Sequence, residues 1–150
     1  MTADPSPSVA HLADLGVAEL VRRTTHGEAT ALEVTEACLE RIARRDPALN
    51  AFSVVLAEEA RAEAAERDRI RAAGEVPGPL HGVPVAIKEE IDVAGCVTTF
   101  GGRGNSTPAS KDGEVVRRLR AAGAVIIGKT RMPEFGQWPY TESVLSLIHI

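Results

Sequence analysis

Cysteine is scarce in this 150-residue sequence, and its placement excludes a disulfide-built fold. The two cysteines, Cys38 and Cys96, form neither a CxxC pair nor a disulfide framework. We therefore expect both to be reduced, buried small hydrophobes, as free cysteines commonly are. This usage fits a cytoplasmic protein.

Long apolar runs and excess positive charge are also missing. No stretch approaches the roughly 20 apolar residues that are needed to cross a bilayer, and the opening MTADPSPSVAHLADL lacks the regions of a secretory leader. The net charge is −4 and the pI is near 5.6. Since no basic field attracts phosphates or anionic lipid, we expect no nucleic-acid partner and no membrane partner.

What remains is an average globular composition, with 44% hydrophobic and 25% charged residues in a chain of one-domain length. A larger protein cut short would look the same by length. Pro5 and Pro7 among polar residues predict a flexible arm over residues 1–8. Residues 9–75 predict an N-terminal helical region.

Two helices stand out in this region. The segment TALEVTEACLERIARRD begins at Thr30, which has capping-box spacing with Glu33, and we expect it to end at Pro47 with arginines in its last turn. Its inward face is predicted to hold Leu32, Thr35, Leu39 and Ile42. After LNAFSVV, a strand or extended link, LAEEARAEAAERDRIRAAG predicts an outer, solvent-covered helix that stops at Gly74.

The composition changes at Gly74, since 11 of the 13 glycines lie in residues 74–150. VPVAI predicts a strand that is buried on both faces, and AVIIG predicts a second strand. Between them DGEVVRRLRAAG predicts a helix capped by Asp112, with Val115, Val116 and Leu119 facing inward. Strand, helix and strand make a βαβ unit with parallel strands. The predicted fold class is α/β: a helical region followed by the first βαβ part of a mixed, helix-flanked sheet, as an incomplete domain.

Two glycine motifs invite a nucleotide-binding interpretation. GAVIIGKT, residues 123–130, matches the phosphate-loop pattern GxxxxGK[ST]. The pattern needs a flexible loop between its glycines, but AVII is a strand former, and Pro133 lets a helix begin only near Met132. GGRGNS, residues 101–106, lacks dinucleotide spacing and predicts a loop. We therefore do not expect nucleotide binding.

Other polar and aromatic groups have ordinary interpretations. Arg117, Arg118 and Arg120 are expected on a solvated helix face. His81 is expected to be a turn histidine that is hydrogen bonded to backbone, because no partner has metal or triad spacing with it. Three clustered aromatics could line a pocket or simply pack together: Phe135, Trp138 and Tyr140.

Lys88 ends the apolar strand VPVAIK, where a lysine must either reach water or occupy a functional site. In open α/β sheets the carboxyl ends of the strands are where ligands bind. A buried neutral lysine is a competent base for activating a serine hydroxyl. On position alone both interpretations stay open.

The motifs GPLHGVPVAIK, IDVAG, TT, EVVRRLRAAGAVIIGKT and MPEF, in this order, resemble the amidase signature family, as does the prelude ALEVTEACLERIARRDPALNAF. The resemblance reaches from the helical region to about Ser143. It implies a large α/β fold that cleaves amides through a Ser–Ser–Lys arrangement without metal or cofactor. Lys88 matches the catalytic lysine, which takes a proton from a bridging serine bonded to the nucleophilic serine, while backbone N–H groups of a glycine-rich loop stabilise the oxyanion.

Two departures accompany the resemblance. Glu89 and Glu90 stand where the family often has Asp-Asn, and two close carboxylates favour the charged form of Lys88. Nothing in the sequence matches the glycine- and serine-rich stretches that carry the family's serines. No serine role is therefore assigned to Ser106, Ser110 or Ser143.

These observations predict an N-terminal piece of an amidase. Residues 76–143 are expected to be the front part of the catalytic domain, and the apolar tail VLSLIHI leads us to expect that residues 144–150 are not native continuation. The intact enzyme is expected to act on a small-molecule amide, and the resemblance allows a homodimer. The fragment should be inactive and, with an exposed sheet edge, prone to aggregate.

Two further functions stay open at this point. Within the resemblance, the chain could belong to the A-type subunit of a tRNA-dependent amidotransferase. From a different class, it could be a non-catalytic interaction module that uses its acidic helices, which predicts cooperative thermal unfolding of the isolated chain.

Overall fold

A computed structural model of the chain describes residues 9–137, 139–143 and 146–147. The helices are α1 (Val9–Leu12), α2 (Val17–His26), α3 (Ala31–Leu49), α4 (Ala57–Ala72), α5 (Glu114–Ala121) and the 3₁₀ turn η1 (Glu134–Gly136). The strands are β1 (Phe52–Val55), β2 (Pro84–Lys88), β3 (Val125–Thr130), β4 (Glu142–Ser143) and β5 (Ser146–Leu147). The expected arm at residues 1–8 lies outside the described residues.

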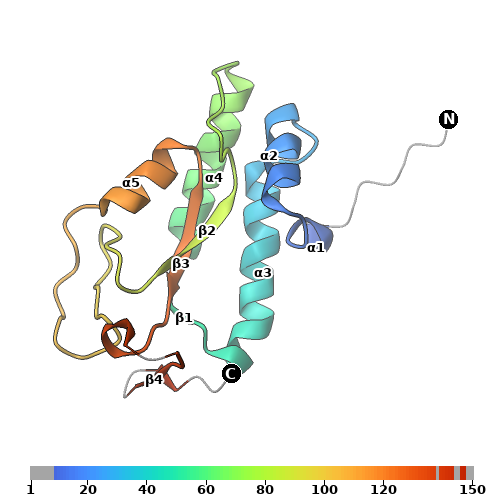
Figure 1. Cartoon of the computed structure of the whole chain (residues 1–150). Coiled ribbons are helices and arrows are strands. Elements are labelled where there is room, and N and C mark those ends of the chain that lie inside the picture. Colours follow the sequence, from blue (N-terminus) through green and yellow to red (C-terminus); the bar gives the residue numbers. More distant parts are fainter. Residues whose placement is uncertain (1–8, 138, 144–145, 148–150) are drawn as a thin grey trace.

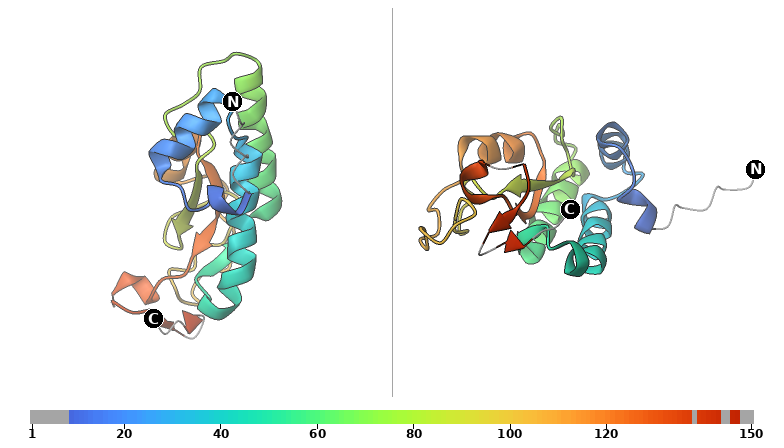
Figure 2. Two further views of the ribbon diagram at one scale, coloured as in Figure 1. Left: turned by 90° about the vertical axis from the view of Figure 1, so that its right-hand side faces the viewer. Right: turned by 60° about the horizontal axis from the view of Figure 1, so that its bottom comes forward.

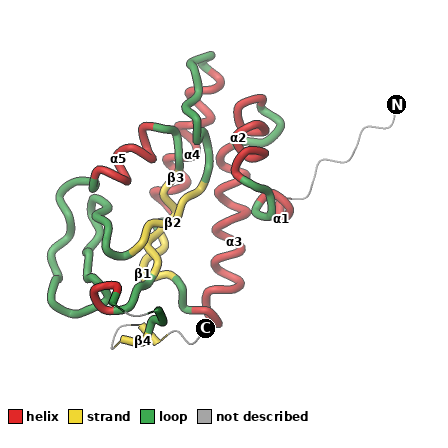
Figure 3. Tube along the Cα trace, in the orientation of Figure 1, coloured by secondary structure: helices red, strands yellow, loops and turns green. Residues whose placement is uncertain are grey.

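The three longer strands form one sheet in the order β1-β3-β2 (Figures 1 and 3). β2 and β3 are parallel and are joined through α5, as the βαβ interpretation predicted, while β1 runs antiparallel to β3. The sheet is therefore mixed, and the predicted α/β fold class is confirmed. β4 and β5 pair separately as a short antiparallel hairpin.

β3 is the central strand, and its alternating side chains serve two hydrophobic cores. Val125 and Ile127 pack with alanines of α3 and α4 on one face. Ile126 points to the other face, where it packs with Val116 of α5 and with Ile87 of β2. Because successive strand side chains point to opposite faces, β3 lies between α3 and α4 on one side and α5 on the other (Figure 2).

The helical region begins largely as its sequence predicts. The capping box of α3 is present, since the Thr30 side chain accepts from the Glu33 backbone while the Glu33 side chain accepts from the Thr30 backbone. The expected end at Pro47 is wrong, because α3 continues to Leu49 and is closed by Asn50 in the left-handed conformation. Proline near a helix end breaks a single backbone hydrogen bond, so the last turn tolerates it.

The extension of α3 moves its predicted arginines away from the last turn, which holds no basic residue. α4 ends with Gly74 at a φ of 74°, as predicted. The prediction of a solvent-covered helix holds only in part, because Glu63 accepts from the Ile126 N–H, Asp68 accepts from the Ala31 N–H, and Ala60 and Ala64 are fully buried against α3 and β3. Small side chains thus let an otherwise charged helix lie close to the sheet.

α5 differs from its prediction in two respects. Its N-cap is Gly113, and no side chain caps it. The Asp112 carboxylate instead accepts from the Ala94 backbone N–H at 2.9 Å and lies near Arg120, so its oxygens are used by tertiary partners. Val116 is fully buried, but Val115 is 51% exposed, because the helix presents a narrower apolar face than the three predicted positions require.

β2 is less buried than a strand covered on both faces. Ile87 is buried, while Ala86 and Lys88 are exposed. Within the described residues β2 pairs with β3 alone, which leaves its other edge without a strand partner. The prediction of burial on both faces is therefore wrong for this chain, since β2 is an edge strand of the described sheet and leaves Ala86 and Lys88 uncovered.

The expected boundary at residues 75 and 76 divides segments that share one sheet and one core. β1 comes from the first segment, and β3, with which it pairs, comes from the second. No helix among the described residues is both long enough and apolar enough to cross a membrane.

Candidate functional site

The carboxyl ends of the parallel strands β2 and β3 lie side by side, because Lys88 is paired with Thr130 in the sheet register. The chain leaves β2 in a tight turn, in which the Ile91 backbone N–H donates to the Lys88 carbonyl at 3.0 Å. The Glu89 N–H donates to the Thr130 carbonyl and extends the ladder by one residue. Backbone contacts on both sides thus define the position of Lys88 at this edge.

Lys88 projects to the open side of the strand end. Its side chain is 48% exposed, and its Nζ lies 3.2 Å from the Glu90 carboxylate. A Cβ at Gly136 of η1 would lie 3.9 Å from the same Nζ, so the chain after β3 passes directly beside the amine. The amine is therefore accessible and borders a backbone that carries no side chain at the point of approach.

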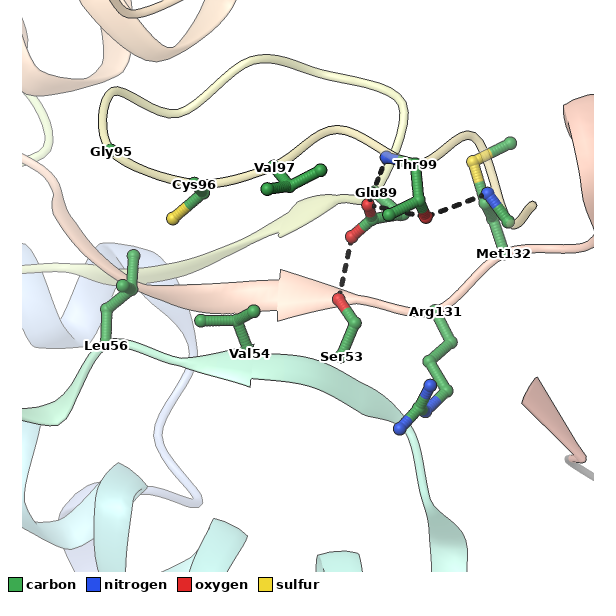
Figure 4. A pocket seen from close by; sticks show the side chains of 11 residues that line it. Ser53, Val54, Leu56, Glu89, Gly95, Cys96, Val97, Thr99, Arg131 and Met132 are labelled. Atoms are coloured by element: carbon green, nitrogen blue, oxygen red, sulfur yellow. Dashed lines mark hydrogen bonds between the residues drawn. The ribbon is translucent and has the colours of Figure 1, made fainter. Parts of the chain in front are cut away.

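Glu89 points the opposite way and is 3% exposed. Its carboxylate accepts from the Ser53 hydroxyl of β1 at 2.7 Å, from the Thr99 N–H at 2.8 Å and from the Thr99 hydroxyl at 3.0 Å (Figure 4). Of the two acidic neighbours expected to act on Lys88, only Glu90 contacts it. Glu89 is turned away because consecutive residues at a strand end face opposite sides.

Lys129, the lysine of the phosphate-loop pattern, is fully buried in β3. Its Nζ donates to the Thr98 hydroxyl at 2.9 Å and to the Val97 carbonyl at 3.1 Å, and lies 3.8 Å from the Glu89 carboxylate. The residues between the two glycines are strand, so no loop exists to hold a phosphate. The GAVIIGKT pattern therefore does not form a phosphate-binding loop in this structure, and its lysine is engaged by Thr98 and Val97 instead.

The buried pair of Glu89 and Lys129 was missed at the sequence level. Lys129 was considered only as a phosphate ligand, and Glu89 only as a neighbouring charge. The alternation of side chains along a strand was the available signal. It places Glu89 and Lys88 on opposite faces once β2 is recognised as a strand. The contact with Lys129 depends on strand pairing and could not be read from spacing.

A pocket of about 590 Å³ lies between β1 and the loop at residues 95–101 (Figure 4). Its walls include Ser53, Glu89, Cys96, Thr99 and Met132, but not Lys88. Burial raises the pKa of the Cys96 thiol, so a thiolate nucleophile is disfavoured there. This pocket and the Lys88 amine are separate features of the chain.

No serine reaches Lys88 among the described residues. Ser106 and Ser110 are exposed in the loop before α5, and Ser143 lies in β4. The part of the chain that is described also holds no group of three or more His, Cys, Asp or Glu that could bind a metal.

The remaining predicted groups have mixed outcomes. Arg117 and Arg118 are exposed as expected, whereas Arg120 contacts Glu63 at 3.0 Å. The aromatic cluster is divided, since the Phe135 ring stacks on Phe100 with centroids 6.2 Å apart. Tyr140 is exposed, and Trp138 lies outside the described residues.

His81 occupies the loop before β2 and is 1% exposed. Its carbonyl accepts from the Thr24 hydroxyl at 2.7 Å, but its ring Nε2 has no hydrogen-bond partner in the described structure. The expected backbone hydrogen bond of the ring is therefore not seen at Nε2. Burial lowers the pKa of His81 below its ordinary value of 6.5; Asp68 opposes this shift, and Arg67 and Arg71 add to it.

Acid should destabilise the fold through His81. Between its lowered folded pKa and 6.5 the unfolded chain binds more protons, so stability is lost as the pH falls through this window. The slope due to one group cannot exceed about 1.4 kcal/mol per pH unit. Urea unfolding at several pH values should show the slope in the parent and in the exposed-site control His26→Gln, but not in His81→Gln. An unchanged slope in His81→Gln would contradict the assignment.

Known proteins resemble this chain in sequence. The family model described as Amidase matches residues 33–147. AmiA2 of Mycobacterium tuberculosis, whose name classes it with the amidases, is 54% identical over 112 residues, which cover 75% of this chain and 23% of that protein. The A-type subunit of the glutamyl-tRNA(Gln) amidotransferase of Salinispora arenicola is 46% identical over 134 residues, covering 87% of this chain and 27% of its own length.

Solved structures agree in fold. The native peptide amidase from Stenotrophomonas maltophilia matches with a TM-score of 0.77 and 41% identity, over 87% of this chain and 26% of that chain. The chain therefore spans about a quarter of the length of the relatives it matches. With a family model that covers most of the sequence and relatives of high identity, the chain belongs to the amidase signature family.

Proposed function

We propose that an intact enzyme carrying this segment hydrolyses carboxylic amides by a Ser–Ser–Lys mechanism, with Lys88 as the base. The observation that carries the proposal is the Lys88 amine, half exposed at the carboxyl edge of two parallel strands. Ligands of open α/β sheets bind at this edge. The peptide amidase of similar fold supports an amide as the substrate class.

The chemistry follows from the role of a neutral amine. Lys88 would accept a proton from a bridging serine, which in turn accepts the proton of the attacking serine. The nucleophile adds to the amide carbonyl, the C–N bond breaks, and the amine leaves with the relayed proton. Water then cleaves the acyl-enzyme and releases the acid. Both serines would lie outside these 150 residues, because nothing in the sequence matches the glycine- and serine-rich stretches that carry them in the family.

Glu90 bears on this role. Its carboxylate lies 3.2 Å from the Lys88 amine. Both side chains are well exposed, so their pair is worth at most about 1 kcal/mol. Rearrangement around a serine hydroxyl can therefore displace Glu90 at small cost.

A second function is favoured by one comparison. The identity with the A-type subunit of a glutamyl-tRNA(Gln) amidotransferase is 46%, which is close to the identity with the amidases. In that case the intact protein would release ammonia from glutamine for a partner protein. The expected small-molecule substrate, the homodimer and the cytoplasmic location stay predictions.

Ammonia release separates these proposals. We expect the intact enzyme to hydrolyse simple carboxylic amides without a partner, and the purified 150-residue chain to be inactive because it supplies a base without a nucleophile. Glutaminase activity that requires added partner subunits would favour the amidotransferase. Turnover by the 150-residue chain that Lys88→Ala abolishes would show the fragment proposal to be wrong.

A further inference from the structure

The buried pair formed by Glu89 and Lys129 contacts two strands and a loop close to Lys88. Through Ser53 it reaches β1, through Thr99 it reaches the loop at residues 97–101, and Lys129 itself belongs to β3. Both ends have further hydrogen-bond partners, as buried charges require. A buried ion pair of this kind need not stabilise the fold. Breaking it leaves an uncompensated buried charge, so it favours one arrangement of the strands and the loop that it joins.

A chain of contacts leads from this pair to the surroundings of the Lys88 amine. Thr99, which is bonded to Glu89, is followed by Phe100, whose carbonyl accepts from the Phe135 N–H at 2.8 Å. Phe100 and Phe135 both have positive φ values, 53° and 49°, a conformation that is uncommon and strained for bulky residues. Gly136, the next residue, borders the Lys88 amine. The loop therefore transmits its position to the wall beside Lys88.

Close packing makes this connection stiff. A Cβ on Gly101 would lie 2.7 Å from the Met132 carbonyl oxygen, and a Cβ on Gly102 would lie 3.0 Å from the Glu134 carboxylate. Both glycines allow the loop to lie directly on the segment before and within η1. Movement of the loop must therefore move η1 as well.

Lys129 is not itself suited to be the base. It is fully buried, and its Nζ is bonded to Thr98 and Val97 within the structure. It is also absent from the residues that line the adjacent pocket. A substrate or a serine from elsewhere could reach it only by displacing these partners.

We propose that Glu89 and Lys129 are positioning residues for Lys88: their buried ion pair holds the 97–101 loop and, through it, η1 beside the amine. The importance of this for catalysis rests on the proposed role of Lys88. Hydrogen exchange in an intact enzyme that carries this segment reports the positions of the loop and η1 rather than turnover, so its failure is distinguishable from a failure of the proposed function.

Amide hydrogen exchange tests the positioning. In Glu89→Ala we expect the Thr99 N–H, which loses its acceptor, and the more distant Phe135 N–H both to exchange at least about tenfold faster. Glu90→Gln is the matched control, because it alters the neighbouring exposed carboxylate and should leave both rates unchanged. Faster exchange at Thr99 with an unchanged rate at Phe135 would overturn the coupling, and so would equal effects in Glu90→Gln.

Discussion

Lys88→Ala in an intact enzyme that carries this segment is expected to lower kcat for amide hydrolysis by at least about 10³-fold. Removing a positioned base from a proton relay typically costs 10²–10⁴-fold, and the loss is larger when the base activates a nucleophile. The side chain is 48% exposed and its one ion pair is with exposed Glu90, so the free energy of unfolding should change by no more than about 0.5 kcal/mol. Steady-state kinetics and urea unfolding measure the two quantities.

Lys111→Ala is the control for this substitution. Lys111 is exposed in the loop before α5 and should retain full activity. The proposed role of Lys88 would be refuted by a folded Lys88→Ala enzyme whose kcat stays within tenfold of the parent. A loss of kcat together with a large loss of stability would instead indicate a structural role, which the exposure of the side chain argues against.

Gly128→Ala is expected to destabilise the fold by at least about 3 kcal/mol, because overpacking against backbone cannot be relieved by a rotamer change. A Cβ at this position would lie 2.4 Å from the Val54 carbonyl oxygen and 3.0 Å from the Phe52 ring. The registers of β1 and of β2 against β3 both shift near Gly128, so the glycine serves the irregular pairing of the central strand with two neighbours.

Gly104→Ala provides the comparison for the central glycine. Nothing lies within 4 Å of a Cβ built at Gly104, which is an exposed loop residue. We expect its free energy of unfolding to match the parent within about 0.5 kcal/mol. If Gly128→Ala loses less than about 1 kcal/mol in urea unfolding, then β1 can move away from β3, and the register seen here is not required for stability.

Local patterns predicted much of this architecture. Thr30 and Glu33 marked the start of α3 through their spacing, and the apolar runs before Lys88 and Lys129 marked two parallel strands with a helix between them. The sequence-based predictions were wrong where a residue could take more than one structural role. Pro47 could end a helix or lie in its last turn, and Asp112 could cap α5 or serve tertiary partners, which is what its carboxylate does.

The sequence alone was sufficient to single out Lys88 and to indicate the family. Both depend on local properties, namely the end of an apolar strand and an ordered set of motifs. The tertiary structure decided the roles of Glu89 and Lys129. Strand pairing brings together side chains 40 positions apart, and burial then requires each charge to be compensated. Spacing along the chain carries no information on such a contact. The motif that suggested a phosphate ligand thus supplies the buried cation that pairs with Glu89.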